Sequence, residues 1–344
     1  MKRAMVARYP VGYMRDLKME EPLVRVANLV EYFDIKKGFF QRKRVFVRAV
    51  DDISFEIKKR ENLALVGESG CGKTTTARLI LRLLGRPTSG TVYFGGKDIF
   101  NLSDEEMKQI RPQMQLVSQD PQASLNPRKR IAQILSKPFR LHTDMNRGEI
   151  ENAVLDLLQT VGLSPPELFA DRYPHEFSGG QRQRISIARA IALKPSFIVA
   201  DEPVSALDVS VRAQVLNLLK GLQKRLGITY LFISHDLAVV RSVSNRVAVM
   251  YLGKLVEVAE VSKLFNAPLH PYTEALLSAT PIPDPERSRS RQRVILGGDV
   301  PSPINPPMGC RFHTRCTIAV EKCKSVEPRL TELGDSYVAC HLRT

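Results

Sequence analysis

The chain has 344 residues, 43% of them apolar, and a formal net charge of +15. This length and apolar content are enough to bury a substantial core, with room for a main domain and an appendage. No stretch reaches the roughly 18 apolar residues of a membrane span. Because the charged residues 1–22 also lack the apolar segment of a signal peptide, we expect a chain that neither crosses a membrane nor is exported.

The basic excess is most visible in two runs, one within residues 36–44 and one of alternating arginines within residues 287–293. The second run contains no aromatic residue and the first only the adjacent Phe39 and Phe40, so neither shows the repeated interleaving of basic and aromatic residues that binds single-stranded nucleic acid. The spacings of helix-turn-helix and zinc-finger modules are also missing from the sequence. The charge therefore indicates a solvated or membrane-facing surface, and no nucleic-acid partner is expected.

The first ordered elements are predicted to be strands. Residues 1–22 are expected to be a weakly ordered leader, and β-rich patterning (LVRVANLV, VRAVDDISFEI, GTVYFGG) runs from Leu23 to about Asn101. Within it, the apolar run Leu63–Val66 leads directly into Gly67–Thr74, which fits G-x-x-x-x-G-K-S/T. The following stretch, Lys73–Leu84, is predicted to be a helix. Strand, loop and helix are the context that a phosphate-binding loop requires.

The loop residues suit polyphosphate chemistry. Glycines let the loop curl with its N–H groups inward, and the helix directs its positive end at the phosphates. Lys73 is predicted to reach the β- and γ-phosphates, and the Thr74 hydroxyl to ligate Mg2+. Cys71 fills a tolerant position, and we expect the helix end to lower its pKa. The predicted nucleotide-binding residues here are Gly67, Glu68, Ser69, Gly70, Cys71, Gly72, Lys73, Thr74 and Thr75.

From Asp104 to Phe177 the pattern becomes helical. Apolar residues recur at helical spacing between Ile150 and Val161, and Gly162 with the prolines at 165–166 ends that helix.

A second buried strand ends in two acids, Asp201 and Glu202. Asp201 is predicted to hold Mg2+, and Glu202 to polarise the water that attacks the γ-phosphate. Since adjacent strand residues face opposite ways, Glu202 must lie where the strand is already ending. An acidic strand end alone is as often structural, but the upstream phosphate loop favours the catalytic interpretation. TYLFISH and RVAVMYL are further parallel-strand candidates, which makes the fold class α/β.

The run Ser178–Gln181 places a glycine turn at a helix N-terminus, before the acidic strand. With Phe177 it resembles the L-S-G-G-Q signature of the ABC transporter ATPase family, with phenylalanine in place of the usual leucine. Three further family elements occur in the expected order, namely Gln119 in VSQDP, Ser205–Asp208, and His235 in LFISHD. The resemblance covers about Leu23 to Val261.

The resemblance implies a RecA-like P-loop ATPase core, an antiparallel β subdomain and a helical subdomain over about residues 104–178. It also implies a head-to-tail dimer, in which ATP lies between one subunit's phosphate loop and the signature of the other. The signature residues that would bind nucleotide are Ser178, Gly179, Gly180 and Gln181.

Other family roles fall on single residues. Gln119 would contact Mg2+ and the attacking water, His235 would contact the γ-phosphate, and Asp208 would communicate across the dimer. Phe33 is the first choice for stacking on adenine, and Tyr32 the second. The stretch at 120–127 would contact the permease.

Beyond Val261 the character changes to a proline-rich extension over residues 262–344, which we expect to be irregular with little core of its own. Its run Leu269–Thr273 (LHPYT) resembles the C-terminal element of oligopeptide, dipeptide and nickel importer ATPases. That likeness implies an ATPase coupled to transmembrane solute transport at the cytoplasmic face of the membrane. Its partners would be a second, related ATPase subunit, two permeases and an extracytoplasmic binding protein. Peptides are the leading substrates, with nickel and oligosaccharides as alternatives.

Four of the five cysteines lie in this extension, at Cys310, Cys316, Cys323 and Cys340. Disulfides are disfavoured in a cytosolic chain, and the close pairs of zinc sites are missing. Iron-sulfur clusters tolerate looser spacing, and GCRFHTRC resembles the cluster-binding tail of this importer subfamily, with Thr314 where proline is common. A [4Fe-4S] cluster is the leading interpretation, with zinc and free or disulfide-bonded cysteines as alternatives.

Three function classes compete: an importer ATPase, a soluble ABC ATPase acting on nucleic acid or ribosomes, and a scaffold that has lost catalysis. The second class usually carries two linked cores or long insertions, whereas this chain has one core. The presence of Lys73, Asp201, Glu202 and His235 argues against the third.

Overall fold

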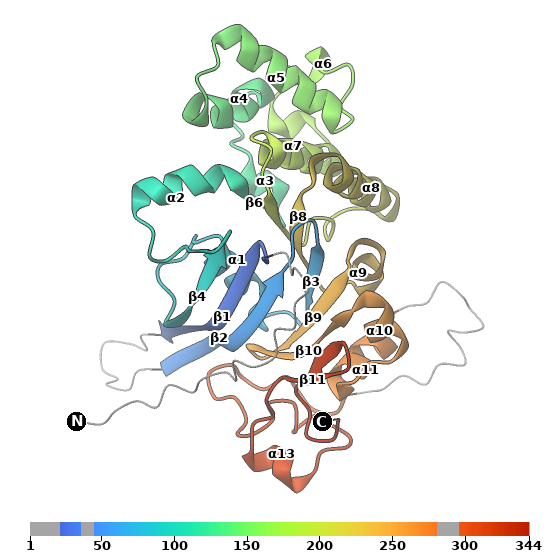
Figure 1. Cartoon of the computed structure of the whole chain (residues 1–344). Coiled ribbons are helices and arrows are strands. Elements are labelled where there is room, and N and C mark those ends of the chain that lie inside the picture. Colours follow the sequence, from blue (N-terminus) through green and yellow to red (C-terminus); the bar gives the residue numbers. More distant parts are fainter. Residues whose placement is uncertain (1–20, 36–44, 281–295, 344) are drawn as a thin grey trace.

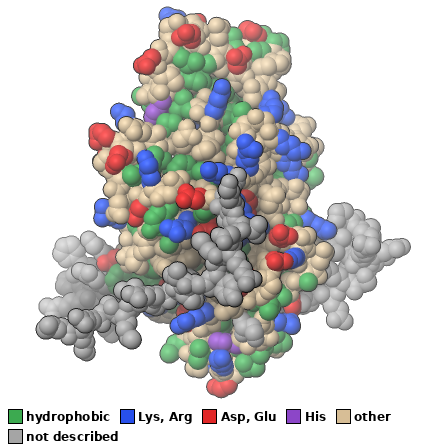
Figure 2. Space-filling model, viewed as in Figure 1, with side chains coloured by type: hydrophobic (Ala, Val, Ile, Leu, Met, Phe, Trp, Pro, Cys, Tyr) green, Lys and Arg blue, Asp and Glu red, His purple; other side chains and the backbone are tan. Residues whose placement is uncertain are grey.

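A computed structural model of the chain describes residues 21–35, 45–280 and 296–343 (Figure 1). Most of the expected leader and both basic runs lie outside these ranges. Lys, Arg, Asp and Glu side chains all spread over the described part of the face seen in Figure 2. None of the described helices is long and apolar enough to cross a membrane.

The smaller sheet is antiparallel and has four strands in the order β2-β1-β4-β5. It matches the β-rich patterning expected before and after the phosphate loop. Its strands are β1 (Val24–Ile35), β2 (Val45–Ile57), β4 (Ser89–Phe94) and β5 (Lys97–Asp98).

The larger sheet has eight strands in the order β11-β12-β10-β9-β3-β8-β7-β6, with parallel pairing from β9 to β6. Every residue of β3, β7 and β8 is buried, as expected for parallel strands covered on both faces. The predicted parallel strands of the α/β core are confirmed. The strands are β3 (Asn62–Val66), β6 (Met114–Val117), β7 (Phe197–Asp201), β8 (Thr229–Ser234), β9 (Arg246–Tyr251), β10 (Lys254–Glu260), β11 (Thr331–Leu333) and β12 (Ser336–Val338).

Helices cover the larger sheet and extend beyond it at one end of the molecule (Figure 1). Their bounds are α1 (Lys73–Ile80), α2 (Asp104–Ile110), α3 (Pro121–Ser124), α4 (Ile131–His142), α5 (Arg147–Thr160), α6 (Glu167–Ala170), α7 (Gly179–Ile191), α8 (Val209–Leu226), α9 (Leu237–Val243), α10 (Val261–Asn266), α11 (Pro271–Ala279) and α13 (Glu321–Ser325), with single 3-10 turns η1 (Arg111–Gln113) and η2 (Pro174–Glu176).

Two helix predictions need correction. The helix after the phosphate loop stops at Ile80 rather than Leu84, because Arg82 takes a left-handed conformation with φ of 48°. The expected helical segment 104–178 is interrupted by β6, which pairs in parallel with β7 at the sheet edge. The helix predicted around Ile150–Val161 is confirmed as α5, with Asn146 forming its capping box.

The C-terminal extension is more ordered than its composition suggests. β12 pairs with β10, so the β11–β12 hairpin adds two strands to the larger sheet. Phe312 is 1% exposed and packs against Tyr251 and Tyr272, with ring centroids 5.3 and 5.4 Å away. The expectation of an irregular appendage is therefore wrong for this hairpin, since three-residue strands give little sequence pattern.

A buried ion pair joins the extension to the smaller sheet. Arg311 pairs with Asp51 of β2, and their side chains are 6% and 11% exposed. Tyr32 also donates its hydroxyl to Asp51 at 2.8 Å, and Lys254 lies 3.8 Å from the same carboxylate. Burial alone would raise the pKa of Asp51, but the two cations and the Tyr32 hydrogen bond outweigh it and hold the pKa below its usual value.

We expect Asp51→Asn to lower the free energy of unfolding at pH 7 by about 3 kcal/mol, because Arg311 would remain buried without its counter-ion. A carboxylate with a depressed folded pKa stabilises the fold above its unfolded pKa of about 4. That contribution is lost as the pH falls through the folded pKa, so the deficit should shrink in acid. Denaturant unfolding at several pH values measures it.

The matched control is Asp335→Asn, which removes the exposed partner of Lys263 and should change stability little. If both substitutions lowered the free energy of unfolding equally at pH 7, the buried Asp51–Arg311 pair would contribute no more to stability than an exposed ion pair.

Candidate active site

The phosphate loop follows β3 and curls tightly around its own backbone. Gly67 and Gly72 both have positive φ, at 152° and 110°. A Cβ at Gly67 would lie 2.1 Å from the Met250 carbonyl oxygen, and one at Gly72 would lie 2.1 Å from the Ala49 carbonyl oxygen. Glycine is required at both positions because the neighbouring backbone leaves no room for a side chain.

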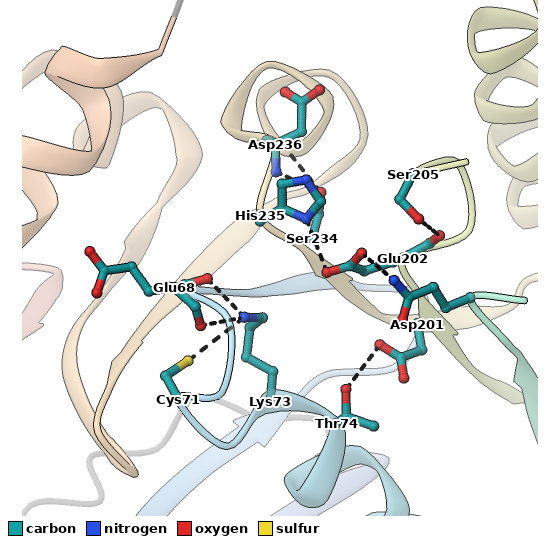
Figure 3. A network of polar contacts seen from close by, with 12 residues as sticks. Glu68, Cys71, Lys73, Thr74, Asp201, Glu202, Ser205, Ser234, His235 and Asp236 are labelled. Carbon is teal, nitrogen blue, oxygen red and sulfur yellow. Dashed lines mark hydrogen bonds and ion pairs between the residues drawn. The ribbon is translucent and has the colours of Figure 1, made fainter. Parts of the chain in front are cut away.

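Lys73 lies inside this curl (Figure 3). The side chain is buried, and its ammonium donates to the carbonyl oxygens of Gly67 and Glu68 at 2.8 and 2.9 Å. It also lies 3.7 Å from the Cys71 sulfur. The loop therefore holds one positive charge among its carbonyl groups at the start of α1.

Cys71 corrects the expectation of a lowered thiol pKa. Its side chain is only 4% exposed, and this burial raises the pKa of the thiol despite the nearby Lys73 charge. Desolvation penalises the thiolate more than the ammonium and the helix end favour it. Cys71 is therefore an inert packing residue of the loop.

The two acids leave the end of β7 in an unusual conformation. Asp201 is the last residue of β7, and Glu202 takes a left-handed conformation with φ of 45°. The Glu202 amide donates to the Ile233 carbonyl oxygen at 3.0 Å, which fixes the turn. The left-handed residue ends the strand, so both carboxylates can reach the same edge, as the sequence required.

Glu202 is held from two sides. Gln119 donates its amide N–H to one carboxylate oxygen at 2.9 Å, and Nδ1 of His235 lies 3.0 Å from the other. The Glu202 side chain is 16% exposed, whereas that of His235 is 60% exposed. Three residues predicted from separate motifs thus meet at one carboxylate.

Asp201 faces the loop helix. Its Oδ1 atom lies 3.5 Å from the Thr74 hydroxyl (Figure 3). Burial raises the pKa of Asp201, and the hydrogen bond from Thr74 opposes the rise. Mg2+ prefers such oxygen ligands and is usually held by one or two carboxylates together with substrate phosphates. The pair fits that ion.

The signature residues begin α7 and bind one another. Ser178 Oγ accepts from the Gln181 amide at 3.3 Å, and Gln181 Oε1 accepts from the Ser178 amide at 3.0 Å. A Cβ at Gly180 would lie 2.3 Å from a Val211 methyl group, so glycine lets α7 pack on α8. Within the described residues, no hydrogen bond joins this run to the phosphate loop. Asp208 is the N-cap residue of α8, but its side chain accepts no hydrogen bond from the first turn of the helix.

The aromatic candidates for adenine differ in their surroundings. Tyr32 donates to Asp51, and burial together with that carboxylate raises its pKa to about 12. Phe33 is the next residue of β1 and is 40% exposed. Phe33 is therefore the more exposed of the two aromatic side chains.

The four tail cysteines are free thiols within electrostatic reach of one another. Burial, and then the neighbouring cysteines, raise the pKa of Cys310 to about 11. A buried thiol beside other thiols becomes a thiolate readily only when a cation binds it. Since metals bind cysteine as the thiolate, four such thiols suit a metal ion or cluster. Nevertheless, the described residues contain no group of three His, Cys, Asp or Glu side chains placed to hold a metal ion. The predicted iron-sulfur or zinc site is not supported by this geometry.

Two residues that contact the phosphate loop from behind the nucleotide site were not predicted from the sequence. Tyr272 accepts a hydrogen bond from the Glu68 amide at 2.9 Å, and Arg315 pairs with the Glu68 carboxylate at 3.0 Å. Tyr272 lies in the LHPYT motif and Arg315 in GCRFHTRC. No local pattern could have shown that these motifs fold back onto the loop.

Comparisons with known proteins agree with this geometry. Residues 50–205 match the family model for ABC transporters, and residues 256–323 match that for the oligopeptide/dipeptide transporter C-terminal region. The oligopeptide transport ATP-binding protein AppF of Bacillus subtilis is 53% identical over 94% of this chain and 98% of its own length. The dipeptide transport ATP-binding protein DppF of Escherichia coli is 46% identical over 95% and 96%.

A solved structure of similar fold is the dimeric ATP-binding cassette MJ0796 bound to ADP and Pi. It has a TM-score of 0.60 and 29% identity, and the match covers 69% of this chain and 98% of that one. Motifs, sheet order and near full-length relatives all lead to one assignment: this chain belongs to the ABC transporter family, among ATP-binding proteins of the oligopeptide/dipeptide type.

Proposed function

We propose that this chain binds ATP with Mg2+ and hydrolyses it to power the import of oligopeptides or dipeptides. The observation that carries the proposal is the Glu202 carboxylate, held between Gln119 and His235 beside the phosphate loop. Its relatives, which are oligopeptide and dipeptide transport ATP-binding proteins, support the substrate class.

In the proposed mechanism the loop amides and Lys73 bind the β- and γ-phosphates. Thr74, Asp201 and Gln119 would hold Mg2+, which supplies positive charge to the phosphate oxygens. Glu202 orients the attacking water and accepts its proton, and this role suits a carboxylate fixed by two hydrogen bonds. His235 is exposed enough to contact the γ-phosphate as well as Glu202.

The second half of each site would come from a partner subunit. Ser178–Gln181 at the N-terminus of α7 offers backbone N–H groups to the phosphates of the partner's ATP. Asp208, whose side chain does not cap α8, would communicate across the dimer. Phe33 would stack on adenine, because its ring is exposed beside a tyrosine already engaged with Asp51.

The proposed assembly is peripheral, at the cytoplasmic face of the cell membrane. It contains a second, related ATPase subunit, two permeases and an extracytoplasmic binding protein. Residues 23–261 would form the ATPase domain and residues 262–344 the extension. The helical residues within 104–178 would face the permeases, with residues 120–127 at the contact. Nickel and oligosaccharides remain alternative cargoes.

We also propose that Cys310, Cys316, Cys323 and Cys340 ligate a [4Fe-4S] cluster. The support is their chemistry: all four are free thiols, two buried and two partly buried, and burial together with the neighbouring cysteines raises the pKa of Cys310 and Cys316. A four-iron cluster is wider than a single ion, so its ligands stand farther apart than those of zinc. The cluster would have a structural role, because metal ligation can order a segment of the extension that has little core of its own.

Glu202→Gln should leave ATP binding intact and slow hydrolysis at least ~100-fold, because an amide cannot accept the proton of water. Phosphate release at saturating ATP measures turnover, and equilibrium titration measures binding. Glu167→Gln makes the same chemical change on exposed α6 and should behave like the wild type. Unchanged turnover in Glu202→Gln would remove this residue from its proposed role.

Cells that lack this chain should fail to take up a labelled tripeptide. The wild-type chain should restore uptake, whereas Lys73→Ala should not, because it removes the cation that binds the phosphates. Parallel uptake of radioactive nickel distinguishes the alternative cargo. Loss of nickel uptake with intact peptide uptake would contradict the peptide assignment while keeping the ATPase assignment.

Chain purified without oxygen should contain about four iron and four acid-labile sulfide per protein if the cluster proposal is right. Cys323→Ser should lose both, whereas Cys71→Ser, which changes the one cysteine outside the tail, should retain them. Colourless, iron-free wild-type protein would refute the cluster, and stoichiometric zinc would support the alternative site.

A further inference from the structure

Glu68, the second residue of the phosphate loop, is held by the C-terminal extension through both its backbone and its side chain. Its amide donates to the Tyr272 hydroxyl at 2.9 Å. Its carboxylate accepts from one guanidinium nitrogen of Arg315, at 3.2 and 3.0 Å to the two oxygens. These partners lie 204 and 247 residues further along the chain.

Tyr272 is a rigid support for this contact. It is fully buried, and its ring packs 4.7 Å from that of Tyr251 and 5.4 Å from that of Phe312. It lies in the first turn of α11, where His270 accepts its amide N–H at 3.1 Å. Glu257, also fully buried, accepts the amides of Leu269 and His270 at 2.9 Å each. These hydrogen bonds fix the backbone of the LHPYT motif and so the position of the Tyr272 ring.

Arg315 is similarly constrained. Its side chain is 9% exposed, its amide donates to the Phe312 carbonyl oxygen at 3.0 Å, and it lies beside Cys316. A buried guanidinium loses much of its hydration, so the charge of Arg315 depends on the Glu68 carboxylate for compensation. The ion pair therefore fixes the guanidinium and the loop side chain relative to each other.

The same residue of the loop also contacts Lys73. The carbonyl oxygen of Glu68 accepts from the Lys73 ammonium at 2.9 Å. Glu68 is consequently held by the extension at its N–H and carboxylate, and by the phosphate-binding lysine at its C=O. Any shift of this residue would move the carbonyl that orients the lysine. Simple attachment of the tail could use any surface residue, whereas both contacts converge on the loop.

We propose that Tyr272 and Arg315 are positioning residues for nucleotide binding, which hold the phosphate loop in the curled conformation that accepts ATP. The proposal rests on the proposed function, in which this loop binds ATP. A loop ordered in advance loses less conformational freedom when its ligand binds, so affinity rises without any direct contact to the ligand. The extension would therefore set ATP affinity from outside the nucleotide site.

The test uses the full-length chain, titrated with a fluorescent ATP analogue in the presence of Mg2+. Arg315→Gln should weaken binding roughly tenfold, and Tyr272→Phe, which keeps the ring but loses the acceptor, roughly threefold. In the assembled transporter, KM for ATP should rise in parallel while kcat at saturating ATP changes less than twofold. Lys263→Gln breaks an exposed ion pair elsewhere in the extension and should not change affinity.

A double-mutant cycle shows whether Arg315 acts through Glu68. Glu68→Gln and Arg315→Gln combined should bind no more weakly than Arg315→Gln alone, because the second change removes a contact already lost. Additive losses would overturn the proposal. So would variants that melt at lower temperature but, while folded, bind ATP as tightly as the wild type.

The wild type and Lys73→Ala separate this inference from the proposed function. Failure of the wild type to bind the analogue would overturn both. Normal wild-type binding that is lost in Lys73→Ala, with unchanged affinity in Arg315→Gln and Tyr272→Phe, would overturn this inference alone.

Discussion

The hydrogen-bonded register of three parallel strands is the constraint on which the site depends. Val66 at the end of β3 pairs with Ser234 of β8, and Ile233 of β8 pairs with Asp201 of β7. The carboxyl ends of parallel strands lie at the same edge of a sheet. The phosphate loop after β3, the two acids at the end of β7 and the histidine after β8 therefore meet at this edge. A slip of one residue in either pairing would turn Asp201 away from Thr74.

The second constraint is the left-handed conformation of Glu202. A non-glycine residue there costs of order 1 kcal/mol and persists only where its surroundings fix it. Here the Ile233 carbonyl oxygen fixes the backbone, while Gln119 and His235 fix the carboxylate. Polar groups at the ends of β6 and β8 thus stabilise a conformation at the end of β7 that Glu202 would not adopt by itself.

Sequence reasoning predicted the features that are encoded locally. The phosphate loop, the strand before Glu202 and the helix start at Ser178–Gln181 each depend on adjacent residues, and the structure places them as expected. The pairing of Arg311 with Asp51, and of Arg315 with Glu68, joins residues more than 240 positions apart. The sequence around an arginine does not indicate which distant carboxylate it will pair with, so these two contacts could not be predicted. The cysteines were interpreted as a metal site from their spacing and from the resemblance of GCRFHTRC to a cluster-binding tail, and neither gives the distances between their sulfurs.

The β11–β12 hairpin has a consequence for the behaviour of the chain in a crowded cell. Without the hairpin, β10 would be the edge of the larger sheet, and the five residues from Leu255 to Ala259 are buried, four of them apolar. Such an edge offers unpaired backbone groups that can add a strand from another molecule. The hairpin replaces it with β11, three exposed residues including Glu332. The extension thus also protects the chain from aggregation through its own sheet.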